Sequence, residues 1–257
     1  MMESLLKADN ISFSYGPRPA LRGVSLSPAA GQITSIIGPN GSGKSTLLKC
    51  LFGFLPASGT IQWRDKPITQ WRRRDLARLV AYLPQSPQHE PGQTVLEVLR
   101  LGRAPYWSAF GLESPDDEQQ VRSVATSLGL DDLLNRPMEE LSGGQRQRAF
   151  IGRCLAQKPA ALLLDEPTTF LDLKHQVEVC RLLKTLAGTG LGILIAWHDL
   201  NLAAAYSDQM FLLENGLIAT AGKPTDVLQP EILSRVYDLP IRRMEGPNGI
   251  PIVTPEI

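Results

Sequence analysis

The sequence predicts an α/β protein with a mixed sheet, an antiparallel β part and an inserted all-helical segment. Three observations lead to this class. The first third alternates short strands with turns, residues 94–157 show helix signals and no convincing strand, and the last third alternates apolar strands with amphipathic helices. A chain of 257 residues is long enough to bury such a core without disulfides or structural metal ions.

The first third is predicted to contain strands broken by turns and one helix. Alternating polarity, β-branched runs and flanking turn residues place the strands at residues 11–15, 32–37, 59–63 and 80–83. Gly16 and Pro17 end the first strand, and Pro84 ends the last. A glycine-rich loop follows residue 37, and we expect a helix over residues 44–54.

The middle of the chain is predicted to be helical. Thr94 and Glu97 have the spacing of a capping box that opens a helix. Ser114 and Pro115, followed by carboxylates, supply a cap, a proline at the first helical position and negative charge near the positive end of the helix dipole. We expect a further amphipathic helix over residues 146–157.

The last third returns to alternating strands and helices. Fully apolar stretches at residues 161–164 and 191–196 indicate buried parallel strands. Between them, apolar side chains recur at helical spacing at Leu173, Val177, Cys180, Leu183 and Ala187. Asn215 and Gly216 predict a hairpin, and we expect a helix over residues 225–237 before an irregular, proline-bearing tail.

We expect one domain over residues 1–257, with an α/β core from residues 1–84 and 158–257 and a helical subdomain from residues 85–157. Basic and acidic residues balance at 26 each, which argues against a general nucleic-acid binder. Three widely spaced cysteines argue against a disulfide framework or a zinc site. The apolar runs fall far short of the ~20 residues that span a bilayer, so another chain would supply any membrane part.

Residues 38–46 fit the pattern GxxxxGK[ST] between a predicted strand and a predicted helix. Glycines let the backbone turn its N–H groups toward phosphate oxygens, and the helix N-terminus adds a positive dipole end. In this pattern Lys44 reaches the β- and γ-phosphates, and the Ser45 hydroxyl binds Mg²⁺. The candidate nucleotide-binding residues are Gly38, Pro39, Asn40, Gly41, Ser42, Gly43, Lys44, Ser45 and Thr46.

Residues 162–167 are a second candidate element, an apolar strand that ends in Asp165 and Glu166. Such carboxylates lie at the carboxyl edge of the sheet, where ligands bind in open α/β folds. Asp165 is predicted to hold Mg²⁺, and Glu166 to orient or deprotonate a water that attacks the γ-phosphate. Without the glycine-rich loop, the same pair would indicate only a cap of the next turn.

Residues 141–145, Leu-Ser-Gly-Gly-Gln, are a third element. Ser142 and Gln145 have capping-box spacing, and the two glycines leave helix N–H groups open to a ligand. An anion-binding helix terminus and a plain helix cap are both compatible with these five residues.

In their order and spacing, these elements resemble the ATP-binding subunit of an ABC transporter over nearly the whole chain. Residues 38–46 match the Walker A motif, residues 162–166 the Walker B motif, and residues 141–145 the family signature. Single residues match the Q-loop glutamine, the D-loop aspartate, the switch histidine and the aromatic residue that stacks on adenine, namely Gln85, Asp172, His198 and Tyr15. The resemblance implies the P-loop NTPase fold of this family.

The resemblance also implies an ATPase in which two subunits pair head to tail around two ATP molecules. The implied catalytic residues are Glu166, His198, Lys44 and Gln85, and the implied Mg²⁺ ligands are Ser45, Gln85 and Asp165. The residues that would contact the partner's nucleotide are Ser142, Gly143, Gly144 and Gln145. Gln85 would couple contact with the γ-phosphate to motion of the helical subdomain.

The implied partners are a second copy of the chain and integral membrane permease subunits, with a periplasmic or lipoprotein substrate-binding protein acting indirectly and no nucleic acid. The helical subdomain would contact the permease. The implied location is peripheral, at the cytoplasmic face of the inner (plasma) membrane.

A narrower resemblance concerns the transported substrate. Residues 168–172 with His175, residues 94–106 and residues 198–208 are similar to importers of ferric siderophores, haem and cobalamin, and residues 105–111 most resemble the ferric siderophore and ferric citrate branch. The implied function is ATP-driven import of an iron complex, a ferric siderophore first. The alternatives are another substrate (cobalamin, haem, zinc or manganese) and then a soluble ABC protein of DNA repair or translation.

Some further side chains have a structural and a functional interpretation. His89 and His175 are predicted to be surface or loop residues without a role. Residues 71–74, Trp-Arg-Arg-Arg, are predicted to be a solvated helix start rather than a nucleic-acid contact. Trp107 and Phe110 lie in a loop of the helical segment and either pack locally or contact the permease.

Overall fold

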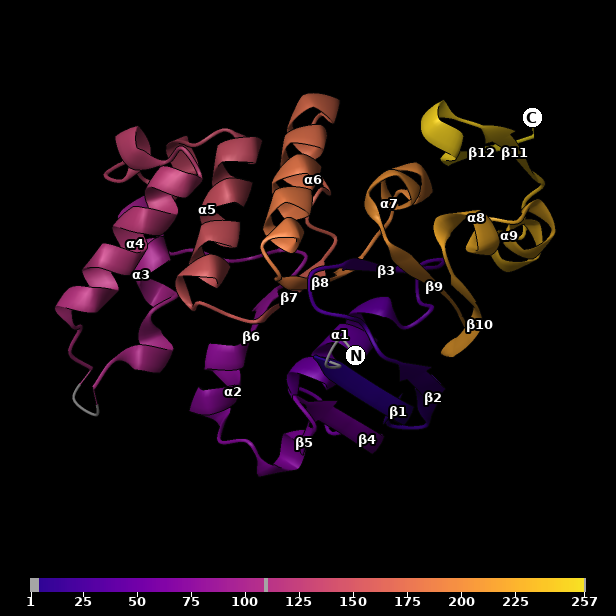
Figure 1. Cartoon of the computed structure of the whole chain (residues 1–257), viewed down its shortest axis with the longest axis horizontal. Helices are drawn as coiled ribbons and strands as arrows, with labels where there is room; N and C mark the ends of the chain where they lie inside the picture. Colours follow the sequence, from indigo (N-terminus) through magenta and orange to yellow (C-terminus); the bar gives the residue numbers. More distant parts are fainter. Residues whose placement is uncertain (1–4, 109–110, 257) are drawn as a thin grey trace.

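The computed structural model describes residues 5–108 and 111–256, and its centre is a mixed sheet. Figure 1 shows this sheet with helices on one side and an antiparallel sheet on the other. In spatial order its strands are β10 (Leu217–Gly222), β9 (Gln209–Glu214), β3 (Ile33–Ile37), β8 (Gly192–Ala196), β7 (Ala161–Asp165) and β6 (Val80–Leu83). All pair in parallel except β10, which is antiparallel to β9. The predicted α/β class is confirmed.

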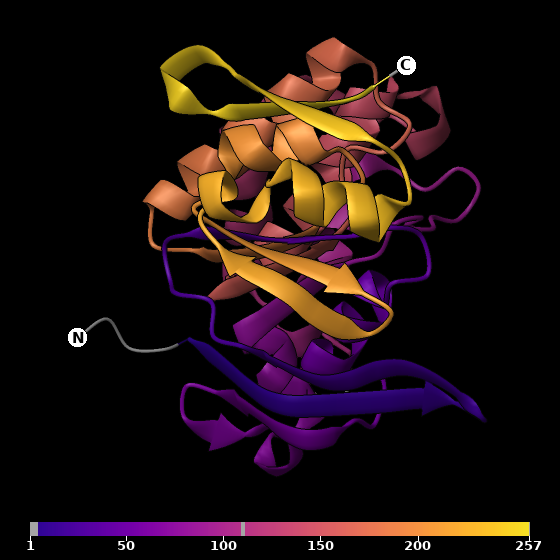
Figure 2. The same cartoon turned by 90° about the vertical axis from the view of Figure 1, so that its right-hand side faces the viewer.

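The second sheet is antiparallel and packs below the first one. Its strands, in spatial order, are β2 (Arg18–Leu26), β1 (Leu6–Tyr15), β4 (Ser58–Trp63) and β5 (Lys66–Pro67). Helix α1 (Lys44–Phe52) lies between the two sheets, because Leu47, Leu48 and Leu51 share one buried cluster with side chains from β1, β2 and β3. Figure 2 shows the long β1–β2 ribbon at the end of the molecule opposite the C-terminus.

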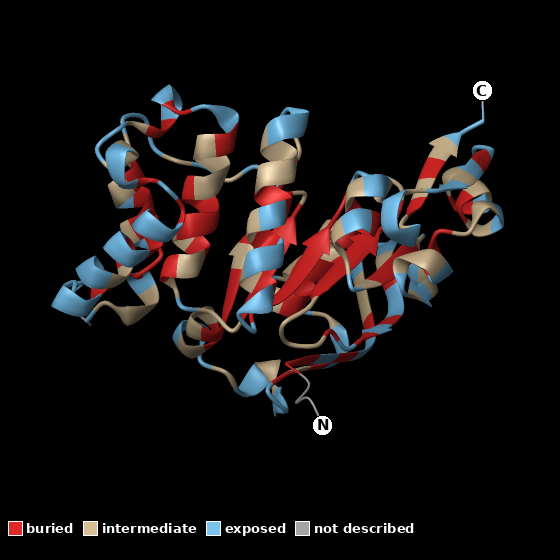
Figure 3. Cartoon of the chain, turned by 45° about the horizontal axis from the view of Figure 1, so that its top comes forward, coloured by how far each residue is buried: buried red, intermediate tan, exposed pale blue. Residues whose placement is uncertain are grey.

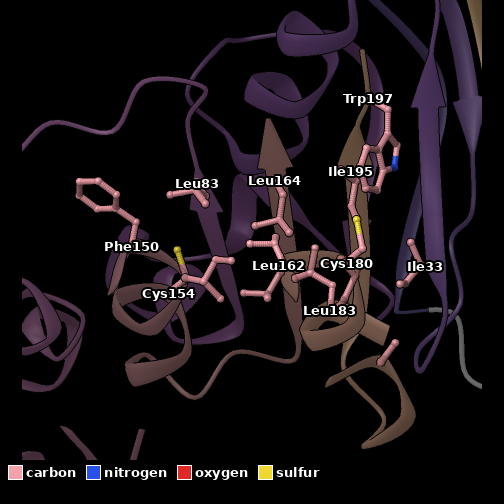
Figure 4. Packing of buried hydrophobic residues seen from close by; sticks show 14 of the residues in the cluster. Ile33, Leu83, Phe150, Cys154, Leu162, Leu164, Cys180, Leu183, Ile195 and Trp197 are labelled. Carbon is pink, nitrogen blue, oxygen red and sulfur yellow. The ribbon is translucent and has the colours of Figure 1, made fainter. Parts of the chain in front are cut away.

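The parallel strands are buried on both faces, as their apolar sequences predict. Successive side chains enter different clusters: Leu162 and Leu164 join the cluster on the helical side, whereas Leu163 joins the cluster around α1. Figure 3 shows the sheet as the buried centre of the chain. Figure 4 shows the helical side, where Leu162, Leu164 and Ile195 meet Cys154 and Cys180. The sheet is therefore packed against apolar side chains on both faces.

Helices cover the upper face of the sheet. Those between β6 and β7 are α3 (Val95–Leu101), α4 (Pro115–Ser127) and α5 (Gly143–Ala156), and those after β7 are α6 (Leu173–Gly188) and α7 (Leu200–Tyr206). Short 3₁₀ turns occur at Ile68–Gln70, Ala104–Tyr106, Asp131–Leu133, Met138–Glu140 and Pro247–Gly249. The Thr94–Glu97 and Ser142–Gln145 capping boxes are both present, so these predicted helix starts are confirmed.

Several elements differ from the expectation. Strand β1 begins at Leu6, five residues earlier than predicted, and β2 was not predicted as an element. The helix start predicted at residues 71–74 is the start of α2 (Arg73–Leu79). The expected helix over residues 225–237 is two helices, α8 (Pro224–Val227) and α9 (Pro230–Tyr237). Pro230 opens the second helix, since its missing N–H and fixed φ suit only the first turn.

The irregular tail predicted after residue 237 is wrong. Strands β11 (Ile241–Glu245) and β12 (Pro251–Pro255) pair as an antiparallel hairpin. The hairpin is fastened to α7 by Asn201, whose side chain donates to the Val253 carbonyl and accepts from the Val253 N–H at 3.1 and 2.9 Å. Figure 2 shows the hairpin lying over the helices at the top of the molecule.

The helical segment is held by a buried ion pair and tied to α2. Arg103 donates to Asp117 at 2.8 Å, and both side chains are at most 5% exposed. Residues 71–74 open α2, as predicted. Arg74 of this helix donates to the carbonyls of Pro105 and Trp107 and so ties α2 to the helical segment. The Trp107 ring is half-buried at this tether, whereas Phe110 lies outside the described residues.

The three cysteines are buried, and none of them pairs in a disulfide. Among the described residues, no helix is long and apolar enough to cross a membrane.

Candidate nucleotide-binding and hydrolysis site

The glycine-rich loop over residues 38–46 links β3 to α1, as the sequence predicts. Gly38 and Gly43 have φ of 145° and 109°, which L side chains rarely adopt. A Cβ at Gly38 would lie 2.2 Å from the Leu213 carbonyl oxygen, and one at Gly43 would lie 2.6 Å from the Ala20 oxygen. The loop therefore presses on β9 and β2 so tightly that only glycine fits at these two positions.

The loop also presents polar groups inward. The buried Ser42 hydroxyl finds no hydrogen-bond partner among the described residues. Lys44 donates from Nζ to the carbonyls of Gly38 and Pro39 at 2.7 and 3.2 Å, so its ammonium lies over the loop. Burial lowers the pKa of the Lys44 ammonium, although the charges of Glu166 and Asp165 oppose this effect. A ligand rich in negative charge fits this cradle.

Asp165 and Ser45 meet at the carboxyl edge of the sheet. Ser45 Oγ donates to Asp165 Oδ1 at 2.9 Å, and Tyr82 donates its phenolic proton to Oδ2 at 3.3 Å. Burial raises the pKa of the Asp165 carboxyl, and the bonds from Ser45 and Tyr82 partly offset this. A hydroxyl beside one carboxylate fits Mg²⁺, which usually takes few protein ligands and fills the rest of its octahedron with phosphate oxygens and waters.

Glu166 is turned out of the strand direction by a left-handed backbone, with φ of 49°. Its Oε2 accepts a bond from Gln85 Nε2 at 2.7 Å and one from Thr169 Oγ1 at 3.1 Å. The carboxylate is thus oriented by two donors from different elements. Thr169 and Tyr82 were not expected to have such roles.

Several of these groups, among them Lys44, Ser45 and Glu166, line one cavity of about 620 Å³, whereas Asp165 lies behind Ser45 and is not part of the lining. The cavity joins the glycine-rich loop, Gln85 and Glu166 to side chains of the antiparallel sheet, and its lining residues are Tyr15, Arg18, Pro19, Ala20, Asn40, Gly41, Gly43, Lys44, Ser45, Thr46, Gln85 and Glu166. Tyr15 is half exposed at its rim and makes an edge contact with Phe13, at 4.9 Å between ring centroids. Arg18, Pro19 and Ala20 were missed because β2 was missed.

The other predicted site residues lie elsewhere in the chain. His198 is exposed just after β8, the strand between β3 and β7, and is not among the described residues that line the cavity. Ser142, Gly143, Gly144 and Gln145 stand at the N-terminus of α5, also outside this lining. Asp172 caps α6 by accepting the N–H of His175 at 2.9 Å. A single chain therefore brings together the glycine-rich loop, Gln85 and Glu166, but not residues 142–145.

This fold and cavity define the class of P-loop nucleotide-binding proteins, with a phosphate cradle, a hydroxyl bonded to a carboxylate, and a glutamate held by two donors. Comparison with known families gives the particular family. The model of the ABC transporter family matches residues 21–169. The chain belongs to this family; it binds ATP and is an ATPase of the kind that is coupled to transport.

Curated relatives match nearly the whole chain. A hemin import ATP-binding protein of Streptomyces coelicolor is 40% identical over 255 residues, which are 98% of this chain and 90% of that protein. An iron(3+)-hydroxamate import ATP-binding protein of Bacillus subtilis is 38% identical, over 95% of this chain and 91% of that protein.

Solved structures agree with the fold. A chain from a transporter assigned to the metal-chelate type, in an inward-facing conformation, has a TM-score of 0.85 at 27% identity and covers 98% of both chains. A bacterial ABC transporter cassette solved as a dimer has a TM-score of 0.74 at 27% identity, over 85% of this chain and 98% of that one.

Proposed function

We propose that this chain hydrolyses ATP to power import of an iron complex through a membrane permease. The observation that carries the ATPase part is the cavity in which Lys44, Ser45, Gln85 and Glu166 converge. The observation that favours the substrate is the similarity to curated ATP-binding proteins of hemin and iron(3+)-hydroxamate import.

ATP binding follows from the geometry of the cavity. The phosphates lie in the cradle of backbone N–H groups at residues 38–46, and Lys44 turns its ammonium from the loop carbonyls to the β- and γ-phosphates. Tyr15 offers the free face of its ring to adenine at the rim. Ser45, Asp165 and Gln85 hold Mg²⁺, which supplies charge neutralisation of the phosphate oxygens.

Hydrolysis requires a base next to the γ-phosphate. Glu166 takes a proton from the attacking water, whose oxygen bonds to the γ-phosphorus as the bond to the ADP oxygen breaks. Gln85 and Thr169 hold the carboxylate in place for this step. His198 comes from the neighbouring strand end and contacts the γ-phosphate to stabilise its charge.

Residues 142–145 act on a second copy of the chain. They form a helix N-terminus, capped by the Ser142 side chain, that lies outside the lining of the cavity of their own chain. In a closed head-to-tail dimer, each such terminus meets the nucleotide in the partner's cavity. The dimeric structure of a related cassette supports this arrangement. ATP then joins the two copies, and hydrolysis releases them.

The permease docks on the helical subdomain, residues 85–157, which stands against a core of residues 1–84 and 158–257. A groove of about 760 Å³ opens directly after Gln85 and is lined by Gln88, His89, Glu90, Pro91, Gly92, Gln93, Glu97 and Leu101. Because the groove begins at Gln88, a movement of Gln85 is transmitted to the docked permease through only a few residues of chain. The protein then works peripherally at the cytoplasmic face of the inner membrane, and a substrate-binding protein delivers the iron complex from outside.

Uptake measurements test this proposal. Cells that lack the chain are given labelled ferric hydroxamate, haem or cobalamin, and are rescued with the wild type or with Glu166→Gln. The wild type is expected to restore uptake of an iron complex, and the variant is expected not to. Rescue of cobalamin uptake instead, or of zinc or manganese uptake in a parallel assay with the labelled metal, would replace the substrate while keeping the ATPase. A wild type that fails to copurify with any membrane protein would favour a soluble ABC protein.

A further inference from the structure

His175 joins two elements that the sequence keeps apart. Its Nδ1 lies 2.8 Å from Asp172 Oδ1, the same oxygen that accepts its backbone N–H at 2.9 Å. An ionised carboxylate only accepts, so Nδ1 carries the proton and donates. These bonds lower the pKa of the Asp172 carboxyl, the bond from the backbone N–H first. The imidazole orientation is therefore set by Asp172.

The oriented ring packs directly on Gly144 of the signature helix α5. A Cβ at Gly144 would lie 2.1 Å from His175 Cδ2 and 2.6 Å from Cγ, so the ring occupies the space of a side chain there. The preceding glycine, Gly143, is exposed and meets only Leu171, whose Cδ2 would lie 3.2 Å from a Cβ there. Leu171 and His175 thus contact the two glycines of the signature, and His175 covers the second one.

This junction faces outward. Ser142 and Gly143 are exposed on one side of it, and Asp172 is exposed on the other. Phe170 is 90% exposed and has φ of 66°, a left-handed conformation that is costly for an aromatic residue. His175 itself is only about one-quarter exposed at its side chain. One ring therefore lies between two exposed elements and contacts both.

We propose that His175 is a positioning residue that fastens residues 168–172 to the N-terminus of α5, so that both meet the partner's nucleotide as one rigid surface. The proposal rests on the head-to-tail dimer of the proposed function. His175 lies outside the described residues that line the cavity of its own chain, so ATP binding by a single subunit does not depend on it. Loosening the junction weakens only the joining of two copies and the hydrolysis that follows.

Two variants separate the two contacts of the ring. His175→Asn keeps a donor at the position of Nδ1 and removes the part of the ring that covers Gly144. His175→Phe keeps a ring there and removes the bond to Asp172. Both are made in the Glu166→Gln background for dimerisation and in the native background for hydrolysis. Lys174→Gln, next along the helix and 79% exposed at its side chain, is the matched control.

Dimerisation with ATP is measured by analytical ultracentrifugation, ATP affinity of the monomer by titration, and folding by the melting temperature. Both variants are expected to raise the dimer dissociation constant at least about fivefold, which is the lower end of typical coupling between two sites. Both are also expected to lower kcat, because hydrolysis follows dimerisation. The monomer's Kd for ATP and its melting temperature are expected to match the wild type.

The results distinguish this inference from the proposed function. The positioning role is refuted if the Glu166→Gln parent dimerises on ATP and a His175 variant in that background has the same dimer dissociation constant, while the same variant in the native background keeps its kcat. If both variants lose melting temperature and monomer ATP affinity in step with dimerisation, the residue is part of the general packing and the inference is also refuted. If the parent itself stays monomeric with ATP, the head-to-tail dimer fails first.

Discussion

Asp117→Asn tests what holds the helical segment together. The wild-type carboxylate is 2% exposed, accepts from Arg103 Nε at 2.8 Å, and accepts the Ser114 N–H and hydroxyl at 2.8 and 2.9 Å. Arg103 also donates to the Ala156 carbonyl and stacks on Tyr106 at 3.7 Å. Among the described residues, Asp117 is the one ion-pair partner of the buried Arg103 guanidinium, and the variant removes its charge.

The magnitude follows from these contacts. An amide oxygen still accepts from Arg103, but the guanidinium is left as an uncompensated buried charge, and the Ser114 cap loses its acceptor. Removing one partner of a buried ion pair lowers the free energy of unfolding by about 3–5 kcal/mol. This range includes about 1 kcal/mol for the loss of the helix cap. Against a total of about 5–15 kcal/mol, this is a large loss.

Urea unfolding followed by circular dichroism measures the change. Glu118→Gln on the same helix is the control, because its ion pair with Arg122 is at least half exposed and the urea midpoint is expected to stay unchanged. A loss below about 1 kcal/mol for Asp117→Asn would show that the pair behaves as a surface salt bridge, and would refute the reasoning.

The pH dependence gives a second readout of the same pair. Burial alone would raise the pKa of Asp117, but the bonds from Ser114 and Arg103 outweigh it and lower the pKa below its ordinary value of 3.8. A lowered pKa means that the stabilisation is present above the unfolded-state pKa and is lost as pH falls through the folded-state value. The difference between wild type and Asp117→Asn is therefore expected to be full at pH 7 and to shrink below about pH 4.

Three further predictions concern the cavity. Lys44→Ala is expected to raise the Kd for ATP at least about tenfold, measured by titration calorimetry, because a buried charge-assisted contact is lost; unchanged binding would contradict its role. Glu166→Gln is expected to lower kcat for hydrolysis by about 10²–10⁴ while ATP still binds and joins two copies, and hydrolysis near the wild-type rate would remove Glu166 as the base. Thr169→Val is expected to lower kcat about two- to tenfold with KM unchanged, since one of the two bonds that orient Glu166 is lost; equal kcat would show that Gln85 alone suffices.

The sequence predicts the parts of this fold whose signal is local. The apolar strands β7 and β8 and the Thr94 capping box are short patterns with one physical cause, and the structure has them. Strand β2 was missed because its alternation is broken: its pairing with β1 shifts register, and Gly23 at φ 80° interrupts it. The β11–β12 hairpin was missed because prolines at 251 and 255 argue against strands, although an edge hairpin accepts them at strand ends.

The site divides in the same way. Lys44, Ser45 and Asp165 could be placed from motifs, because a strand, a tight loop and a helix fix where each side chain points. Tyr82 and Thr169 could not, since their importance lies only in which carboxylate they reach across the sheet edge. No periodicity or spacing within one segment contains that information.

Gly144 shows why even a correct motif leaves a role undecided. From the sequence, a glycine at this helix start keeps N–H groups open to an anion, and a plain cap is equally compatible. The structure adds a second demand, since the His175 ring fills the place where a Cβ would be. A substitution at Gly144 therefore disturbs the surface for the partner's nucleotide and the packing inside the same chain. Loss of activity in such a variant would not separate the two causes, whereas His175→Asn leaves the glycine itself intact and does.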